Sequence, residues 1–191
     1  MYWIMLTTRT TDDDLVIHGR PERIETLGVS FDQGIKIPNP IKDIEIIRTE
    51  EHRGNYTDNL ISFGIPGLVI NEKIQSILNE LAANNIEYHD LMIHDEVMGC
   101  EISEYKIANI IGLEKCINMK LSQVRIDEDY GGIEAIERLV LDEKKLKETT
   151  LRIFRIMELE QIVLAHDSVK EAFEANNISG VEFMHPEKFV L

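Results

Sequence analysis

Gly67-Leu68-Val69-Ile70 begins the segment that is most informative about the fold, and Ala83-Asn84-Asn85-Ile86 ends it. The first run is apolar and short, as a strand would be, and the residues that follow show the three- and four-residue spacing of one apolar helical face. A returning strand is expected from Ile86 to Ile93. The segment therefore predicts a strand–helix–strand unit. The apolar face of its helix consists of Ile74, Ile77, Leu78 and Leu81.

Asparagines are expected at both ends of this helix. Asn71 precedes the first turn, whose backbone N–H groups lack partners within the helix, and its side chain can accept a hydrogen bond from one of them. Asn84 or Asn85 can adopt the left-handed conformation that ends a helix.

The same tetrapeptide recurs as Ala175-Asn176-Asn177-Ile178 at the end of a second predicted unit. Gln161-Ile162-Val163-Leu164 is its first strand, Asp167 or Ser168 is the expected helix cap, and Gly180-Val181-Glu182-Phe183 is the returning strand. The first helix is expected to be about one turn longer than the second. The two units reflect either a duplication or the reuse of a common arrangement. The inward face of the second helix consists of Val169, Ala172 and Phe173.

Outside these units the sequence predicts further strands separated by polar loops. Residues 30–40 are expected to form a loop because they contain Gly34, Pro38 and Pro40. The charged segment Glu50 to Asn59 is expected to be an exposed loop. Further strands are predicted at Tyr2–Thr7, Ile44–Arg48, Asn109–Gly112 and Ser122–Arg125.

The segment from Ile133 to Leu141 fits two interpretations. Ile133, Ile136 and Val140 suit a helix, whereas Arg138 to Asp142 suits a strand followed by a helix cap. We favour the strand, because the alternating run from Leu151 to Ile156 could pair with it.

These patterns predict an α+β fold with a mixed or largely antiparallel sheet and helices packed on it. Residues 1–66 form an N-terminal strand and loop region, and residues 67–191 form the α+β region that holds both units. We expect the two regions to be one continuous domain.

Charge and composition narrow the classes of function. The net charge of −15 repels phosphate backbones, so nucleic acid is not an expected partner. No apolar run approaches the roughly 20 residues that a membrane span needs, and the apolar N-terminus lacks the basic start of a secretory signal. Cys100 and Cys116 are too few for a disulfide framework and are expected to be buried thiols. The sequence therefore predicts a cytoplasmic protein with no membrane partner.

No catalytic or cofactor motif is assembled in the sequence. His89-Asp90 with His94-Asp95-Glu96 carries metal-ligand side chains, but the two histidines are five residues apart and would face opposite sides of a strand. His166 is better explained as a helix cap than as a catalytic base. Gly131-Gly132 lacks the Lys-Ser/Thr of a phosphate loop. We therefore expect no enzyme activity, no metal and no cofactor.

Two acidic clusters are the candidate partner-binding residues. Such runs are usually solvated turns, but each could also meet Lys or Arg side chains of a basic protein. The clusters are Asp12, Asp13, Asp14 and Asp127, Glu128, Asp129.

Several stretches of the second half, among them Tyr105 to Asn109 with Ser122, Leu139 to Asp142 and Ile153 to Arg155, resemble immunity family eleven of bacterial polymorphic toxin systems. The resemblance covers Gly67 to Phe183 and lies in core-strand patterns rather than in catalytic signatures. It implies a protein that neutralises a toxin domain, usually encoded beside it. The matching stretches are Tyr105 to Asn109 with Ser122, Leu139 to Asp142, Ile153 to Arg155, Ile162 to Leu164, Val169 to Ala172 and Gly180 to Phe183, with Gly67 to Ile70 as an earlier element.

The resemblance and the acidity together predict an immunity protein that binds a cognate, basic toxin protein and occludes it stoichiometrically. The alternative is a non-inhibitory adaptor or binding module of a secretion system. A third possibility, an enzyme of unrecognised type, would require a deep pocket with convergent polar groups. The sequence does not define an oligomeric state.

Overall fold

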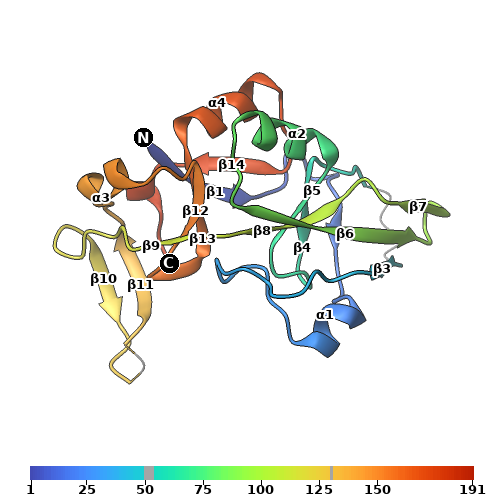
Figure 1. Ribbon diagram of the computed structural model, residues 1–191, viewed down its shortest axis with the longest axis horizontal. Helices are drawn as coiled ribbons and strands as arrows, with labels where there is room; N and C mark the ends of the chain where they lie inside the picture. The colour runs from blue at the N-terminus through green and yellow to red at the C-terminus, as the bar shows by residue number, and fades with distance from the viewer. Residues whose placement is uncertain (50–53, 130) are drawn as a thin grey trace.

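The computed structural model describes residues 1–49, 54–129 and 131–191 (Figure 1). Strands dominate it, and four short α-helices accompany the strands in this part of the chain. The α+β class predicted from the sequence is confirmed.

The first of three sheets is built around the N-terminal strand. All of its pairs are antiparallel except the one between β12 and β9, at an edge. Among the described residues its spatial order is β14 (Val181–Met184), β1 (Tyr2–Thr7), β13 (Leu159–His166), β12 (Ile153–Ile156) and β9 (Leu113–Glu114).

The second sheet contains the long strand β6 and is also largely antiparallel. Its two parallel pairs, β2 with β4 and β3 with β6, again lie at its edges. Its order in the described chain is β2 (Val16–Ile17), β4 (Asn59–Ser62), β5 (Leu68–Ile70), β8 (Lys106–Ile110), β6 (Ile86–Asp95) and β3 (Ile44–Arg48), with β7 (Cys100–Ile102) also paired to β6.

The third sheet is a two-stranded hairpin that projects from the body of the molecule at the lower left of Figure 1. Its strands are β10 (Gln123–Ile126) and β11 (Ile133–Arg138). The remaining elements are α1 (Glu22–Leu27), α2 (Glu72–Glu80), α3 (Glu143–Glu148), α4 (Asp167–Ala175) and the 3₁₀ turn η1 (Pro186–Lys188).

Both predicted strand–helix–strand units are present and share one topology. In the first unit β5 and β6 lie on either side of β8, and both run antiparallel to it. In the second unit β13 and β14 flank β1 in the same way. Each unit is therefore a split unit, in which a strand from elsewhere in the chain fills the gap between the two parallel strands.

The two units bury their helices against a shared core. α2 and α4 lie side by side at the top of Figure 1 and contact each other. Ile74 and Leu78 of α2 pack in one cluster with Val169 and Phe173 of α4. By contrast, α1 lies at the opposite side of the molecule and packs against β3. α2 and α4 thus bury residues of the apolar stripes that their sequences predict, but the helices do not all cover one face.

The repeated tetrapeptide does not occupy equivalent positions in the two units. In the first helix the left-handed residue is Ala82, with φ of 53°, and in the second it is Asn177, with φ of 50°. The backbone bond from Ala83 N–H to the Leu78 carbonyl matches the bond from Ile178 N–H to the Phe173 carbonyl. The first tetrapeptide therefore starts after its helix has ended, whereas the second spans the end.

Three predictions about the helix ends need correction. The first helix ends through Ala82 rather than through Asn84 or Asn85, because the periodic residues run out before the asparagines. The cap of α4 is the His166 side chain rather than Asp167 or Ser168, although the role predicted for His166 is confirmed. The two helices are the same length, nine residues each.

Asn85 has a different role, which joins the two sheets. Its side-chain Nδ2 donates to the carbonyl oxygens of Ile111, at 2.5 Å, and Ile153, at 2.8 Å. Its own carbonyl accepts from the Ile111 N–H at 2.8 Å. Since Ile153 begins β12 and Ile111 follows β8, Asn85 connects the ends of strands in the two large sheets.

Ala82→Gly is expected to stabilise the protein by about 1 kcal/mol, because an L-residue with a Cβ is strained in the left-handed region and glycine is not. The free energy of unfolding in urea measures this effect. The matched control is Ala175→Gly, an exposed residue in the last turn of α4, which should instead lose about 0.5–1 kcal/mol. Equal losses in both variants would contradict the assignment of Ala82 as the helix-ending residue.

Two loop and strand predictions also differ from the structure. The segment from Leu151 pairs with β13 rather than with a strand at Arg138 to Asp142, because the strand here is β11, which ends at Arg138 and pairs with β10. Within the segment predicted as an exposed loop, residues 50–53 lie outside the described chain, while Thr57 and Asn59 are buried. Asn59 begins β4, and its side chain donates to Thr7 Oγ1 and to the Gly180 carbonyl, both at 3.0 Å.

Strands from both predicted regions share sheets. β1, from residues 1–66, pairs with β13 and β14, and β4 pairs with β5 across the boundary at residue 67. We therefore propose that the chain is a single domain.

Candidate functional site

The β10–β11 hairpin presents the second acidic cluster at its tip. Ile126 lies opposite Ile133, and the connecting turn holds Asp127, Glu128 and Asp129. Asp127 shapes the turn: its Oδ1 accepts from the Asp129 N–H at 2.8 Å, and its N–H donates to the Gly132 carbonyl at 2.8 Å. Glu128 and Asp129 are exposed, so two carboxylates are accessible at the end of a projecting ribbon.

The base of the hairpin is fixed to the protein core. Ile136 is buried in the same cluster as Phe154 and Leu164, and it exchanges both backbone hydrogen bonds with Leu191, at 3.0 Å each. Arg125 and Glu134 pair across the exposed face at 2.8 Å. The tip is therefore held on a rigid base rather than on an unsupported loop.

One exposed apolar side chain lies next to the acidic tip and another lies before β10, at the base end of the hairpin; the sequence analysis missed both. Ile126, next to the tip, is 40% exposed, and Leu121, just before β10, is 60% exposed. Such residues beside charged ones are typical of protein-binding surfaces. The exposure of Ile126 could have been predicted, because a two-stranded ribbon can bury only one of its faces.

Only part of the first acidic cluster is exposed. Asp12 and Asp13 are exposed, but Asp14 is 4% exposed and accepts hydrogen bonds from the N–H groups of Thr10 and Thr11 and from the Thr11 hydroxyl. Burial alone would raise the pKa of Asp14, but these hydrogen bonds outweigh it and lower the pKa below its usual value. Asp14 thus shapes the loop and offers little surface to a partner.

The metal-ligand side chains on β6 are used in other ways. His89 is buried against the Phe31 ring, while His94 lies on the opposite strand face between Glu45 and Glu101, at 3.2 and 3.3 Å. Asp95 is buried and bonded to Arg48. Over residues 1–49, 54–129 and 131–191, no group of three or more His, Cys, Asp or Glu side chains is placed to hold a metal ion.

The two thiols differ in environment. Cys116 is buried as expected, and burial raises the pKa of its thiol to about 12, so it stays protonated at neutral pH. Cys100 is exposed on β7, contrary to expectation, because it lies on the short outer strand of the sheet.

None of the helices in the described part of the chain has the length and apolar character needed to cross a membrane.

A rigid α+β scaffold that projects an acidic and partly apolar hairpin has features typical of a protein that binds another protein. The chain belongs to the Immunity protein family (Imm11), whose sequence model matches residues 9–188 of its 191 residues. A comparison with curated proteins finds no significant match. The predicted family is thus confirmed, and the match begins well before Gly67, so the N-terminal region belongs to the family pattern as well. Membership assigns the protein a role in toxin immunity, with a cognate toxin as its partner.

Proposed function

We propose that this immunity protein binds its cognate toxin stoichiometrically and blocks the toxin's active site or the access of its substrate. The observation that carries the proposal is the family match over residues 9–188. We assign the contact to the tip of the β10–β11 hairpin, with Glu128 and Asp129 facing basic side chains of the toxin. Asp12 and Asp13 form a second, smaller acidic contact.

The shape of the hairpin supports this assignment. A narrow ribbon can enter a concave site, as an active-site cleft usually is. Its tip is exposed, and its base is anchored through Ile136. Because the tip is held in position before binding, little conformational entropy is lost when the complex forms.

Charge supports a basic toxin as the partner. The net charge of −15 would draw a basic protein toward the molecule and speed their association at low salt. Affinity would then come from apolar burial, for which Ile126 and Leu121 are available. This division of roles makes the association rate the quantity most sensitive to the acidic tip.

The test uses the toxin encoded beside the gene for this protein, a double variant Glu128→Lys with Asp129→Lys, and the unmodified chain. We expect the double variant to associate with the toxin at least about 10-fold more slowly at low salt, because attraction is replaced by repulsion. Association rates are measured by surface binding at two salt concentrations. Toxin activity is titrated in parallel, and it should fall linearly to zero at one equivalent of the unmodified protein.

The control is Glu22→Lys with Glu25→Lys on α1, which changes the net charge equally and lies far from the hairpin. Equal slowing in both double variants would show that total charge matters and the hairpin does not. Failure of the unmodified chain to bind the toxin would reject the proposed function. Loss of toxin activity at a small fraction of one equivalent would instead indicate an enzymatic mode of protection.

A further inference from the structure

The first sheet has an open edge at β14. Among the described residues β14 pairs with β1 alone, and it is the last strand in the spatial order of its sheet. Figure 1 shows it beside β1 and beneath α4. The outer side of such a strand carries backbone N–H and C=O groups that have no partner in the sheet, and these groups can pair with a strand of another protein.

The strand register identifies the backbone groups that face the open edge. The carbonyl of Gly180, directly before β14, accepts from the Thr8 N–H, directly after β1, at 3.1 Å. Backbone groups of an antiparallel strand point to alternate sides, so Glu182, two residues on, also bonds to β1. The N–H and C=O groups of Val181 and Phe183 therefore face outward, and neither N–H has a hydrogen-bond partner within the described chain.

A groove of about 280 Å³ lies at this edge, between the end of α4 and β14. Its lining includes Val181, Phe183 and Phe173, and the two aromatic rings are 5.8 Å apart. The volume is below the roughly 300–1,000 Å³ of a small-molecule site, so it suits one or two side chains. Residues opposite Val181 and Phe183 in an added strand would point to this same face of the sheet and enter the groove.

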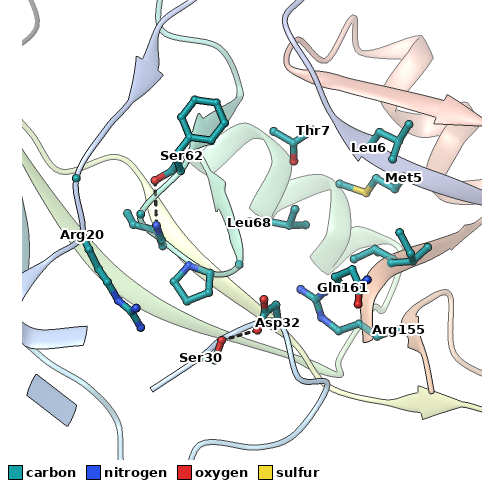
Figure 2. Close-up of a pocket in the computed structure, with 18 residues that line it drawn as sticks. Met5, Leu6, Thr7, Arg20, Ser30, Asp32, Ser62, Leu68, Arg155 and Gln161 are labelled. Carbon is teal, nitrogen blue, oxygen red and sulfur yellow. Dashed lines mark hydrogen bonds between the residues drawn. The ribbon is translucent and has the colours of Figure 1, made fainter. Parts of the chain in front are cut away.

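The larger cleft of about 810 Å³, shown in Figure 2, offers no such edge within the described chain. Its lining includes residues of β1, β13 and β12, each of which already has a neighbouring strand on both sides. Its polar side chains also have partners: the Ser30 hydroxyl donates to Asp32, and Ser62 Oγ accepts from the Ile65 N–H at 3.2 Å (Figure 2). A strand can therefore be added at β14 but not at the sheet face in this cleft.

Charge selects the kind of strand that fits the open edge. Glu182 is exposed and forms no ion pair with any described residue, whereas Glu174 at the groove already pairs with Lys170 at 2.6 Å. Opposite charges that face each other across two strands stabilise their pairing, and like charges destabilise it. A second copy that paired through both Val181 and Phe183 would place Glu182 against its own counterpart. The edge therefore favours a strand with Lys or Arg at that position.

We propose that the open edge of β14 binds an extended segment of the toxin as an added antiparallel strand, in which a Lys or Arg opposite Glu182 lies between two apolar residues. The identity of the partner rests on the proposed function, whereas the pairing chemistry does not. A stable interface buries roughly 800 Å² on each partner, more than a hairpin tip of a few residues supplies. An added strand would contribute backbone hydrogen bonds, and its alternate side chains would give specificity.

The test uses acetyl-Lys-Val-Lys-Val-Lys-amide, whose two valines would lie opposite Val181 and Phe183. One analogue is N-methylated at both valines, and the matched control is N-methylated at the central lysine. Only the valine N–H groups face β14 in the proposed pairing, so the first analogue should bind at least about 10-fold more weakly and the second as tightly as the parent. All three peptides carry the same charge, so a general attraction to the acidic protein would not separate them.

Binding is followed by NMR through the amide signals of β14. With the parent peptide at about ten times its Kd, hydrogen exchange at the Val181 and Phe183 amides should slow about 10-fold, because their N–H groups become bonded. The Glu182 amide is the internal control and should be unaffected, because it already bonds to β1.

Val181→Pro removes an outward N–H without removing a bond to β1, a change that edge strands tolerate, and it should weaken peptide binding about 10-fold. Val181→Thr keeps the N–H and the β-branched shape, so it is the control and should leave binding nearly unchanged. In the toxin complex, Val181→Pro should raise the dissociation rate and leave the association rate unchanged, because the acidic tip sets the latter. If Val181→Pro does not fold, Glu182→Lys decides the result: it should reverse the preference for the parent peptide over acetyl-Lys-Val-Glu-Val-Lys-amide.

Equal binding of the two methylated analogues, or no slowing of exchange up to about 10 mM peptide, would overturn the strand pairing. An unchanged peptide preference in Glu182→Lys would overturn the assignment of the basic residue. An unchanged dissociation rate of Val181→Pro from the toxin would overturn the assignment of the segment to the toxin. The peptide titration needs no toxin, so it can fail while neutralisation through the hairpin stands, and it can succeed while neutralisation fails.

Discussion

Asp95→Asn is expected to lower the free energy of unfolding by about 3–5 kcal/mol, the usual result of breaking a buried ion pair from one side. Arg48 on β3 and Asp95 on β6 lie opposite each other in the strand register, and both side chains are 0% exposed. Arg48 Nη1 donates to both carboxylate oxygens, at 2.6 and 2.7 Å, and the Tyr56 hydroxyl donates to Oδ2 at 2.7 Å. The variant removes the negative charge that offsets the buried guanidinium. In a chain of this size the melting temperature should fall by on the order of 10 °C.

The matched control for this variant lies on the same strand. Asp90 is 88% exposed and pairs with Lys106 at 3.1 Å, so Asp90→Asn should cost less than about 1 kcal/mol. Comparable losses of unfolding free energy in the two variants would show that the buried Arg48–Asp95 pair stabilises the protein no more than an exposed pair does. The free energies of unfolding of both variants and of the unmodified chain are measured by denaturant unfolding.

The acid dependence of stability gives a second readout of the same pair. Burial alone would raise the pKa of Asp95, but hydrogen bonds from Tyr56, Met98 and Arg48 outweigh it, so the folded-state pKa is lowered. The stabilisation is therefore fully present above the unfolded-state pKa of about 3.9 and is lost as the pH falls through the lower folded-state value. The stability difference between the unmodified chain and Asp95→Asn should shrink over this acid range. A stability difference that does not change over this pH range would contradict the lowered folded-state pKa of Asp95.

This pair also shows what sequence patterns convey and what they omit. The alternation of β6 predicts that Asp95 and His89 point inward together, but nothing local to either residue identifies Arg48 as a partner 47 positions away. The spacing of His89 and His94 argued against a metal site, but it did not indicate what Asp95 binds instead. The counter-charge on a neighbouring strand becomes visible only when the parallel pairing of β3 with β6 is known.

Elements with strong periodicity were predictable, and short or non-local ones were not. β1, β3 and α2 follow directly from their patterns. In contrast, α1 buries only Ile24 and β2 contains two residues, so neither produces a periodic signal. Their structure depends on packing with distant segments, which overrides local preference.

The candidate binding residues show the same contrast between features that the local sequence reveals and features that it does not. The charge of Glu128 and Asp129 at a turn is evident in the sequence, and the hairpin places both at an exposed tip. Burial of Asp14 depends on hydrogen bonds from its own loop, which charge patterns do not reveal.

Gly180→Ala is expected to lower the free energy of unfolding by about 3–5 kcal/mol, because it combines backbone strain with a steric clash. Gly180 has φ of +80°, and a Cβ there would lie 2.0 Å from the Asn59 carbonyl oxygen and 2.9 Å from Thr57 Oγ1. The same residue joins three segments: its N–H donates to Thr10 Oγ1 at 2.8 Å, and its carbonyl accepts from the Thr8 N–H at 3.1 Å and from the Asn59 side chain. A shift that relieves the clash must therefore disturb the contact between β4 and the sheet that holds β1 and β14.

Gly28→Ala separates the two contributions to this loss. Gly28 has φ of +61° at the end of α1, but a Cβ there meets nothing within 4 Å, so this variant should lose only about 1–2 kcal/mol of strain. The excess loss in Gly180→Ala then measures the close approach of the β4 end to the residues before β14. Equal losses, determined by urea unfolding, would mean that this contact adjusts easily and does not hold the two sheets together. Since Gly180 directly precedes β14, which belongs to another sheet than the β10–β11 hairpin, the fraction of Gly180→Ala that remains folded should still associate with the toxin at the unmodified rate. A slower rate for the folded fraction would show that the β4–β14 contact also positions the toxin-binding surface.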